Sequence, residues 1–478
     1  MKKYIVSICL GMFLFSSCSN WLDVKPKTTV EEEEVFSREL GFKEALTGAY
    51  IKMASTDLYA KNLSYGFLDI LGQRYQINAV ANYENPLWYT FPSTYTESYT
   101  EAIWSKMYNV IANLNNLLYY CDKNRDVFTT EHYYEIIKGE ALGLRAFLHF
   151  DLLRMFGPIY KDNPTAKRIA YRTEFNQEPK EMQPSNVVVD SIIADLKRAE
   201  ILLTNIDPLN FEFPKTEDGT LPVYRAGEEY EEQNMTSDRF LFYRHKRMNL
   251  YAVKAMLARV YLYAGNKTEA VNYANQVIDG KYFDLIGDAT DVLRSKEIVF
   301  SVYVDKFDQQ VTDITNGTSY LIVKESFLNE MFDVANDGTN DLRIREGVGF
   351  DYGTNGIKMR KYKQENLWAS TEGTVVLIRL SEMYYILAEC AATPGEAAEF
   401  LNKVRNIRGV DPVVCTEANR LDEIEKEYRK EFYGEGQLFF FYKRHAYTTF
   451  LHCPVNQMAE SNYMFSWPDN ETLFGKTN

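Results

Sequence analysis

The chain is 478 residues long, with 46% hydrophobic and 25% charged residues, which is ordinary globular usage and leaves ample material for a large core. That composition excludes a mini-protein, a collagen-like chain and an intrinsically disordered chain. Its 53 Lys and Arg against 67 Asp and Glu give a net charge of −14, so a nucleic acid would be repelled rather than bound.

The N-terminus has the pattern of a secretion signal. A basic start precedes an apolar run over residues 5–15, which is too short for a membrane span of about 20 residues. Two serines before Cys18 resemble the cleavage site of a bacterial lipoprotein, which predicts a signal peptide over residues 1–17 and a lipid anchor on Cys18. The alternative is an ordinary secretory signal with an incidental cysteine.

Segment 76–104 is rich in aromatic residues and is broken by prolines. Its seven aromatic residues are Tyr83, Trp88, Tyr89, Phe91, Tyr95, Tyr99 and Trp104. Sugars have flat C–H faces edged by hydroxyls, so a sugar site needs exposed rings with polar groups at the rim. We therefore expect Trp88, Tyr83 and Tyr89 to stack on a ligand, with Asp69 and Arg74 as the polar rim. The alternative is that Trp88 packs beneath the loop and touches no ligand.

Three regions have the apolar spacing of helices. Residues 133–156 carry an apolar side chain every three or four positions, and the Gly-Pro pair that follows predicts the end of that helix. Residues 249–279 predict a helix, a tight turn at Gly265 and a second helix, and residues 380–404 repeat that plan. Such helix pairs resemble tetratricopeptide repeats.

The helical regions are not arranged in tandem. Long stretches rich in Tyr, Asn, Asp, Gly and Pro separate them, at 76–104, 161–184, 208–239 and 336–374. Long loops on a rigid scaffold are common places for binding groups. Residues 297–304 are β-rich, and we expect short pieces of this kind to form small hairpins beside the helices.

Trp368 lies in the last of these stretches, near Tyr362 and Gln364 and a run of basic residues over 358–363. One interpretation is that Trp368 completes a ligand clamp. The other is that the basic run is a solvated strand edge and that Trp368 fills a gap in the scaffold.

Four cysteines remain beyond Cys18. They are Cys121, Cys390, Cys415 and Cys453. With no CxxC pair, they suggest neither a zinc site nor redox chemistry, and we expect buried thiols. A bridge from Cys415 to Cys453 or to Cys390 stays open.

Five groups of residues follow one another in a distinctive order. They are Cys18, Leu22, Asp23 and Pro26; Phe36, Ala45, Leu46, Gly48 and Tyr50; Arg145, Ala146, Phe156 and Gly157; Asp341 and Arg343; and Glu427, Glu431, Phe432, Glu435, Gly436 and Arg444. Together they resemble the SusD-like (RagB/SusD) family of outer-membrane lipoproteins. Tyr428 and Gln437 stand where that family commonly has Arg.

The resemblance implies a mainly α-helical fold, with four tetratricopeptide-like helix pairs as a base and irregular loops on the opposite face that hold an oligosaccharide. It also implies a partner, a SusC-like TonB-dependent outer-membrane transporter, over which the protein sits as a lid. Members of the family are non-catalytic, and some branches bind peptides.

Enzyme and metal signatures are weak. The chain has no HExxH, GxSxG, Walker or GxGxxG pattern, and its five histidines lack metal-ligand spacing. His149 is expected to be a satisfied helix residue rather than a base. A glycosidase needs only two carboxylates at a suitable separation, and with 67 Asp and Glu in the chain that alternative stays open. The acidic cluster around Asp333 and Asp337 departs from an EF-hand loop at Ala335 and Ile344.

We therefore expect a signal peptide over 1–17, then an N-terminal region over 18–225 and a C-terminal region over 226–478 that form one compact unit. The expected function is a surface-exposed, lipid-anchored outer-membrane protein that captures oligosaccharides for a SusC-like transporter, without a metal or another cofactor. The alternatives are a peptide-binding member of the same family and a purely structural helical-repeat scaffold.

Overall fold

A computed structural model describes residues 32–75, 89, 91, 94–176, 178–207, 240–241, 243–307, 322–354, 356–363 and 371–475. Helices dominate these residues. The longer helices are α3 (Glu39–Met53), α6 (Thr94–Lys123), α7 (Tyr133–Phe156), α8 (Ser185–Leu203), α10 (Leu250–Tyr263), α11 (Lys267–Asp279), α16 (Leu380–Cys390), α17 (Pro394–Ile407), α18 (Arg420–Glu431) and α19 (Leu438–His445). The short ones are α4 (Phe67–Leu71), α14 (Glu325–Met331), α15 (Val334–Asp337), α20 (Glu460–Tyr463), α21 (Asp469–Phe474), η2 (Arg125–Val127), η4 (Arg244–Lys246) and η5 (Ser295–Glu297).

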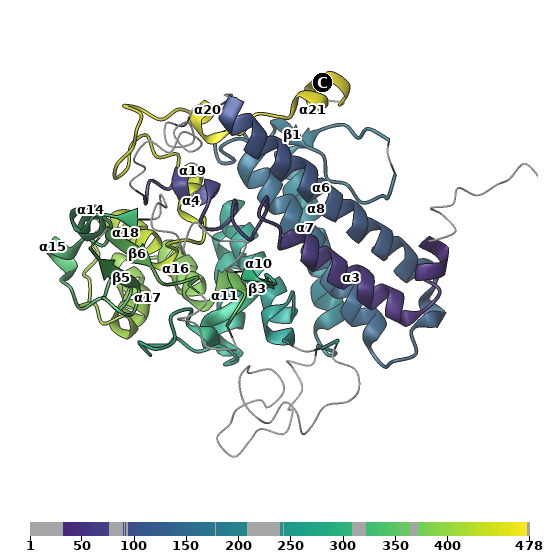
Figure 1. Cartoon of the computed structure of the whole chain (residues 1–478), viewed down its shortest axis with the longest axis horizontal. Helices are drawn as coiled ribbons and strands as arrows, with labels where there is room; N and C mark the ends of the chain where they lie inside the picture. Colours follow the sequence, from purple (N-terminus) through teal and green to yellow (C-terminus); the bar gives the residue numbers. More distant parts are fainter. Residues whose placement is uncertain are drawn as a thin grey trace, which may run out of the picture.

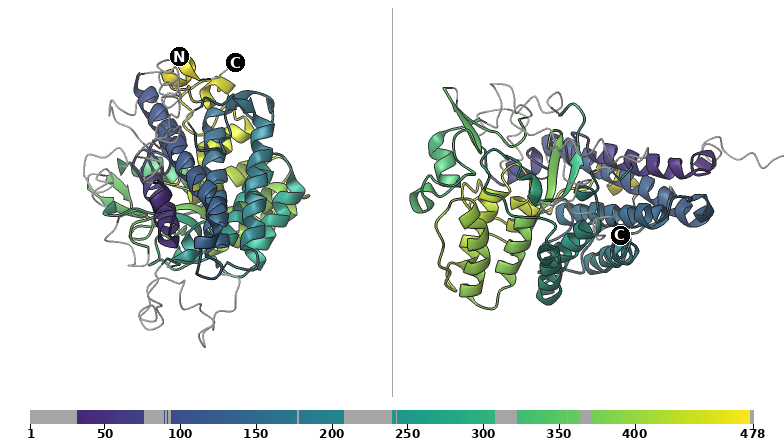
Figure 2. Two further views of the ribbon diagram at one scale, coloured as in Figure 1. Left: turned by 90° about the vertical axis from the view of Figure 1, so that its right-hand side faces the viewer. Right: turned by 90° about the horizontal axis from the view of Figure 1, so that it is seen from below.

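The long helices pack against their neighbours in chain order. α3 contacts α6, α6 contacts α7, and the series continues through α8, α10, α11 and α16 to α17. Figure 1 shows α3, α6, α7 and α8 side by side along one half of the molecule, with α16, α17 and α18 in the other half. Figure 2 shows the same two groups from the side and from below. This arrangement is the tetratricopeptide-like scaffold that the sequence predicts.

The structure confirms all three predicted helical regions. Residues next to each helix end set where the helix starts or stops. Helix α7 ends at Phe156, where Gly157 takes an extended conformation before a proline. Helix α10 begins after Asn249, whose side chain accepts the N–H of Ala252 at 2.9 Å. Helix α17 begins with a capping box of Thr393 and Glu396.

Seven short strands accompany the helices in the described parts of the chain. They are β1 (Lys167–Ile169), β2 (Gln183–Pro184), β3 (Ile298–Tyr303), β4 (Ile322–Val323), β5 (Phe350–Gly353), β6 (Gly356–Met359) and β7 (Thr374–Arg379). β1 pairs with β2, and β3 with β7, both antiparallel. A third sheet has the order β4-β6-β5, in which β5 and β6 form a hairpin.

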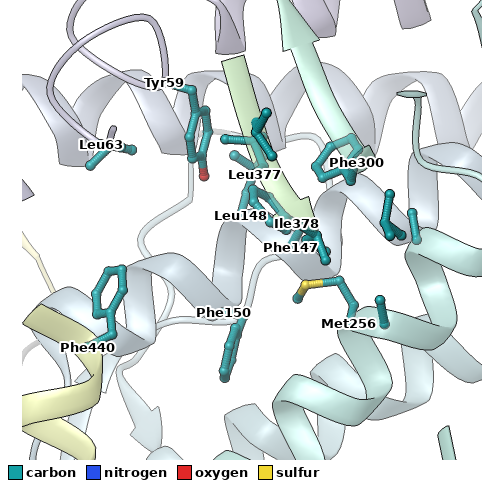
Figure 3. Packing of buried hydrophobic residues seen from close by; sticks show 14 of the residues in the cluster. Tyr59, Leu63, Phe147, Leu148, Phe150, Met256, Phe300, Leu377, Ile378 and Phe440 are labelled. Carbon is teal, nitrogen blue, oxygen red and sulfur yellow. The ribbon is translucent and has the colours of Figure 1, made fainter. Parts of the chain in front are cut away.

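The strand expected at 297–304 is present as β3, but its partner is not local. β3 pairs with β7, so that Tyr303 lies opposite Thr374. Figure 3 shows the ribbon packed on α7, with Phe300 and Ile378 beside Phe147 and Leu148. The ring centroids of Phe147 and Phe300 are 5.1 Å apart, which joins the ribbon to the helical core.

Two further sequence features have structural outcomes. The four cysteines beyond Cys18 are free thiols, and Cys121 and Cys415 are buried. Of the helices that the structure describes, none combines the length and the apolar character needed to cross a bilayer.

Candidate functional site

An open cleft lies where α3, η4 and the β3–β7 ribbon meet. It has a volume of about 460 Å³, which is within the range of small-molecule sites. Its walls are Thr47, Tyr50 and Ile51 of α3; Tyr243, Lys246 and Arg247 around η4; Ser301 and Tyr303 of β3; and Glu372 and Thr374 at the start of β7. We call this surface the tyrosine cleft.

Two tyrosine rings on the walls of the cleft face solvent. Tyr303 is 66% exposed and Tyr243 is 43% exposed, although most large apolar side chains of the described chain are buried. Tyr243 has a φ of 53°, in the left-handed region that non-glycine residues rarely adopt. Strained residues of this kind cluster at binding sites, so the conformation of Tyr243 supports a binding role for this cleft.

The ring of Tyr303 packs directly against Gly373, where only a glycine leaves room for it. Its φ is 67°, and a Cβ at this position would come within 2.6 Å of the ring atom Cε2 of Tyr303. The carbonyl of Gly373 also accepts the N–H of Val304 at 2.7 Å. A side chain at Gly373 would therefore strain the backbone and displace the ring of Tyr303.

The floor of the cleft is held by hydrogen bonds to buried groups. The hydroxyl of Tyr50 donates to the carboxylate of Glu140 and accepts the N–H of Met248 at 2.9 Å. Arg247 donates to both oxygens of Glu140, at 2.8 Å each. Burial, with the Glu140 charge, raises the pKa of Tyr50 well above its usual value, so Tyr50 remains a neutral part of the floor.

The rim offers both signs of charge and several hydroxyls. Glu372 is exposed, and Lys246 approaches the Tyr243 ring with its Nζ 5.5 Å from the ring centroid. Thr47 and the largely buried Ser301 and Thr374 add hydroxyl groups to the lining. The hydroxyls of Thr47 and Ser301 already donate to backbone carbonyls, so they can only accept from a ligand. Flat rings next to hydrogen-bonding groups can bind a polyhydroxylated ligand.

A second concave surface lies among α6, α7 and α8, with a volume of about 880 Å³. We call it the helical groove. Its exposed large apolar side chains are Tyr119, Phe175 and Ile201. Its charged groups are largely paired, because Lys138 contacts Asp122, and Arg145 and Arg198 both contact Asp195. The helical groove therefore presents mainly paired charges around its exposed apolar side chains.

The structure corrects the expected polar rim. Asp69 and Arg74 are fully buried and form an ion pair at 3.1 Å. Asp69 also accepts the hydroxyl of Tyr75 and the N–H groups of Gly434 and Gly436, at 2.7, 2.9 and 3.1 Å. Side chains that their own chain covers completely cannot form a ligand rim, so Asp69 and Arg74 are structural.

The expected aromatic platform is corrected at Tyr89. Its ring is buried against Phe439, Phe450 and Tyr463, and its hydroxyl donates to the carbonyl of Leu71. Three other rings of the same segment also pack inward. Phe91 and Tyr99 contact Phe67, and Trp104 contacts Phe156. Helix α6 begins at Thr94, so the C-terminal part of the expected loop is helical.

Four predicted site residues lie outside the described residues. They are Cys18, Tyr83, Trp88 and Trp368. The predictions for these residues therefore stay predictions. In sequence, Trp368 is four positions from Glu372 of the tyrosine cleft.

His149 and Asp337, the other residues considered for catalysis or metal binding, both have partners within the protein. His149 is buried, and both its ring nitrogens have backbone partners, the carbonyl of Arg145 and the N–H of Arg172. Asp337 pairs with Arg405 and Lys430. In the parts of the chain that the structure describes, no group of three or more His, Cys, Asp or Glu side chains could hold a metal ion.

The basic run at 358–363 is only partly a solvated strand edge. Lys361 is buried and contacts Glu435 at 2.8 Å. Arg360 and Lys363 both pair with Asp351 of β5. Tyr362, expected beside a clamp, is fully buried and stacks at an angle on Tyr65.

Tyr243 and Tyr303 were not singled out from the sequence. Tyr303 is the last residue of a strand that is otherwise buried, and Tyr243 follows the long stretch 208–239. The only available signal was their position beside irregular segments, which many other tyrosines share.

The motif residues near the C-terminus form a buried network of ion pairs. Arg343 contacts Asp341 and Glu427 at 2.8 Å each, and Glu431 contacts Arg408 at 2.6 Å. Nearby, Glu435 bridges Lys361 and Arg379. These residues join α17, α18 and β7, so they shape the fold and not the cleft.

Most of the chain matches proteins of one family. Residues 20–214 match a family model described as "Starch-binding associating with outer membrane", and residues 331–471 match one described as "SusD family". SusD-like protein P38 of Formosa agariphila is 23% identical over 515 aligned positions, covering 97% of this chain and 94% of the relative.

Solved structures show the same fold. A SusD-like carbohydrate binding protein from Bacteroides vulgatus superposes with a TM-score of 0.68 and 17% identity, covering 91% of this chain and 96% of the other. Surface glycan-binding protein A from Bacteroides thetaiotaomicron superposes with a TM-score of 0.62 and 16% identity, covering 90% of this chain and 96% of the other.

Proposed function

The chain belongs to the SusD family, and from this premise we propose that it captures an oligosaccharide in the tyrosine cleft. The observation that carries the proposal is the pair of exposed rings, Tyr243 and Tyr303, beside the carboxylate of Glu372 and several hydroxyls. Two proteins of similar structure are named as carbohydrate-binding or glycan-binding proteins, which supports a sugar as the ligand.

The proposed mechanism is binding without bond cleavage. The tyrosine rings stack on the C–H faces of the sugar, while the groups at the rim pair with its hydroxyls. A neutral glycan releases no counterions when it binds, so affinity should respond weakly to salt. Tyr50 and Arg247 are already held by Glu140, so the floor of the cleft needs little ordering when the ligand binds.

We further propose the cellular setting from the family and the N-terminus. Lipid chains on Cys18 would hold the protein to the outer membrane, facing the cell surface. A SusC-like TonB-dependent transporter would receive the captured glycan. Membrane fractionation of a Cys18→Ser variant and copurification of a barrel protein with the wild type test these two steps.

The binding experiment is isothermal calorimetry of the mature protein against a panel of neutral oligosaccharides. Tyr303→Ala and Tyr243→Ala should each weaken binding about tenfold or more, because each removes a stacking surface. Tyr119→Ala is the matched control, since Tyr119 is an exposed tyrosine of the helical groove. It should leave the affinity unchanged.

Other outcomes identify the alternatives. Loss of glycan binding in Tyr119→Ala, with both cleft variants unaffected, would move the site to the helical groove. Binding of peptides in place of glycans would support the peptide-binding alternative. Absence of binding to either panel would favour a structural scaffold. Trp88→Ala belongs in the same series, because the prediction that Trp88 stacks on the ligand is still untested.

A further inference from the structure

Glu140 is a fully buried carboxylate of α7 that lies behind two walls of the tyrosine cleft and does not line it. It accepts the hydroxyl of Tyr50, which belongs to the α3 wall. It also accepts Arg247 through both oxygens, at 2.8 Å each, and Arg244 at 2.5 Å. One side chain of α7 therefore joins α3 to the segment around η4 that carries Tyr243.

Arg244 has a second carboxylate partner, Asp207. This carboxylate accepts Nη2 of Arg244 at 2.7 Å and the backbone N–H of Leu250, the first residue of α10, at 2.9 Å. In this cluster the charges of Glu140 and Asp207 balance those of Arg244 and Arg247. If Glu140 lost its charge, two guanidinium groups would face a single carboxylate, and their repulsion would drive η4 away from its present position.

The cluster also fixes the backbone of Tyr243. This residue directly precedes Arg244, and its carbonyl accepts the N–H of Lys246 at 2.9 Å, which closes the turn of η4. Its φ of 53° is unfavourable for a residue with a side chain, so the conformation persists only where surrounding contacts hold it. The two ion pairs of the fully buried Arg244 provide that hold.

We propose that Glu140 is a positioning residue of the tyrosine cleft, which holds Tyr50 and Tyr243 in the arrangement that a glycan binds. This inference rests on the proposed function of the cleft. Glu140 touches no ligand, and it acts by ordering the α3 and η4 walls before the ligand arrives. Without its charge, binding would have to order these walls, and the affinity would fall.

Amide hydrogen exchange tests this hold without any ligand. Glu140→Gln keeps the shape of the side chain and removes its charge. Asp69→Asn is the matched control, because Asp69 is also a fully buried carboxylate paired with an arginine but does not belong to the cleft. Exchange at the N–H groups of Lys246, Arg247 and Met248 should be about tenfold or more faster in Glu140→Gln than in Asp69→Asn.

Calorimetry with the neutral oligosaccharide panel tests the consequence for binding. Glu140→Gln should bind about fivefold or more weakly than the wild type, at a temperature where circular dichroism shows every protein folded. Asp69→Asn should keep the affinity of the wild type. Equal affinities of Glu140→Gln and the wild type would overturn the proposal, and so would equal exchange at residues 246–248 in the two variants.

Tyr50→Phe decides the case if Glu140→Gln fails to fold. It removes only the hydroxyl that joins Glu140 to the N–H of Met248, so exchange at Met248 should be faster than in the wild type. Unchanged exchange there would overturn the proposal. A wild type that binds no glycan would refute the proposed function itself, whereas full glycan affinity in Glu140→Gln would refute only the role of Glu140.

Discussion

His149 lies fully buried in α7, where its Nδ1 faces the carbonyl of Arg145 at 2.9 Å and its Nε2 accepts the N–H of Arg172 at 3.0 Å. Its ring stacks on Tyr171, with 4.0 Å between the ring centroids. These contacts satisfy the neutral imidazole. Burial lowers the pKa of His149 to about 3, so the residue is a structural component of α7 and not a general base.

This residue should make stability depend on pH. In the unfolded chain a histidine takes up a proton near pH 6.5, whereas folded His149 stays neutral down to about pH 3. The unfolded state therefore binds more protons in that range, and stability is lost as the pH falls below about 6.5. We expect the free energy of unfolding to drop by roughly 1 kcal/mol per pH unit between pH 6 and 5.

Urea unfolding of the wild type, His149→Asn and His132→Gln at pH 7.5, 6 and 5 checks this prediction. His149→Asn should have a shallower pH dependence, because it removes the titrating group. His132 is exposed, so His132→Gln should keep the slope of the wild type. Identical slopes in all three proteins would show that His149 does not titrate as described.

At the scale of elements, helix ends were the most predictable feature. The boundaries of α7 follow from apolar periodicity and a Gly-Pro stop, which involve only neighbouring residues. The start of α6 was missed because its first turns are Thr-, Tyr-, Ser- and Glu-rich and show no apolar stripe. The partner of β3 was missed because β7 lies far along the chain, where no turn signal connects them.

Two glycines inside helices should respond in opposite ways to the same substitution. A Cβ at Gly48 in α3 would meet no atom within 4 Å, whereas a Cβ at Gly143 in α7 would lie 2.6 Å from Cγ of Met248. Gly48→Ala should raise the free energy of unfolding by about 0.5 to 1 kcal/mol, because alanine loses less entropy in a helix. Gly143→Ala should lower it by about 1 to 2 kcal/mol through overpacking.

Denaturant unfolding of both variants measures these changes. A loss of stability in Gly48→Ala would mean that another part of the protein packs closely on α3 at this position. A gain in Gly143→Ala would mean that Met248 moves aside at little cost.

At the scale of the whole molecule, α4 connects the beginning of the described chain to its end. Arg74 donates to the carbonyls of Phe432 and Tyr428, and Asp69 accepts N–H groups from Gly434 and Gly436. These bonds join segments more than 350 positions apart. They support the expectation that regions 18–225 and 226–478 fold as one unit.

We therefore predict a single unfolding transition that Asp69→Asn weakens as a whole. The substitution leaves Arg74 buried without its carboxylate, which should cost about 3 to 5 kcal/mol. Fluorescence and far-ultraviolet circular dichroism should report coincident transitions in the wild type and in the variant. Asp162→Asn, at an exposed position, is the control. Two separate transitions would show that the regions unfold independently.

The sequence by itself determined the helical scaffold and the family, and it predicts an N-terminal sorting signal that lies outside the described residues. Helix periodicity, caps and short motifs each span only a few neighbouring residues, so they can be recognised without knowing the fold. The sequence alone could not distinguish Tyr303, which faces solvent, from Tyr89, which is buried. Nor could it distinguish Glu372 at the rim of the tyrosine cleft from Asp69 in the core.

Only the tertiary structure decided those cases. Whether a ring is exposed, or a charge is paired, depends on segments that are distant in sequence and meet only in the folded chain. Asp69 is buried because residues 434–436 cover it, and Tyr303 is placed by Gly373 of a different segment. The location of the proposed binding surface therefore follows from packing, whereas the class of the protein follows from local pattern.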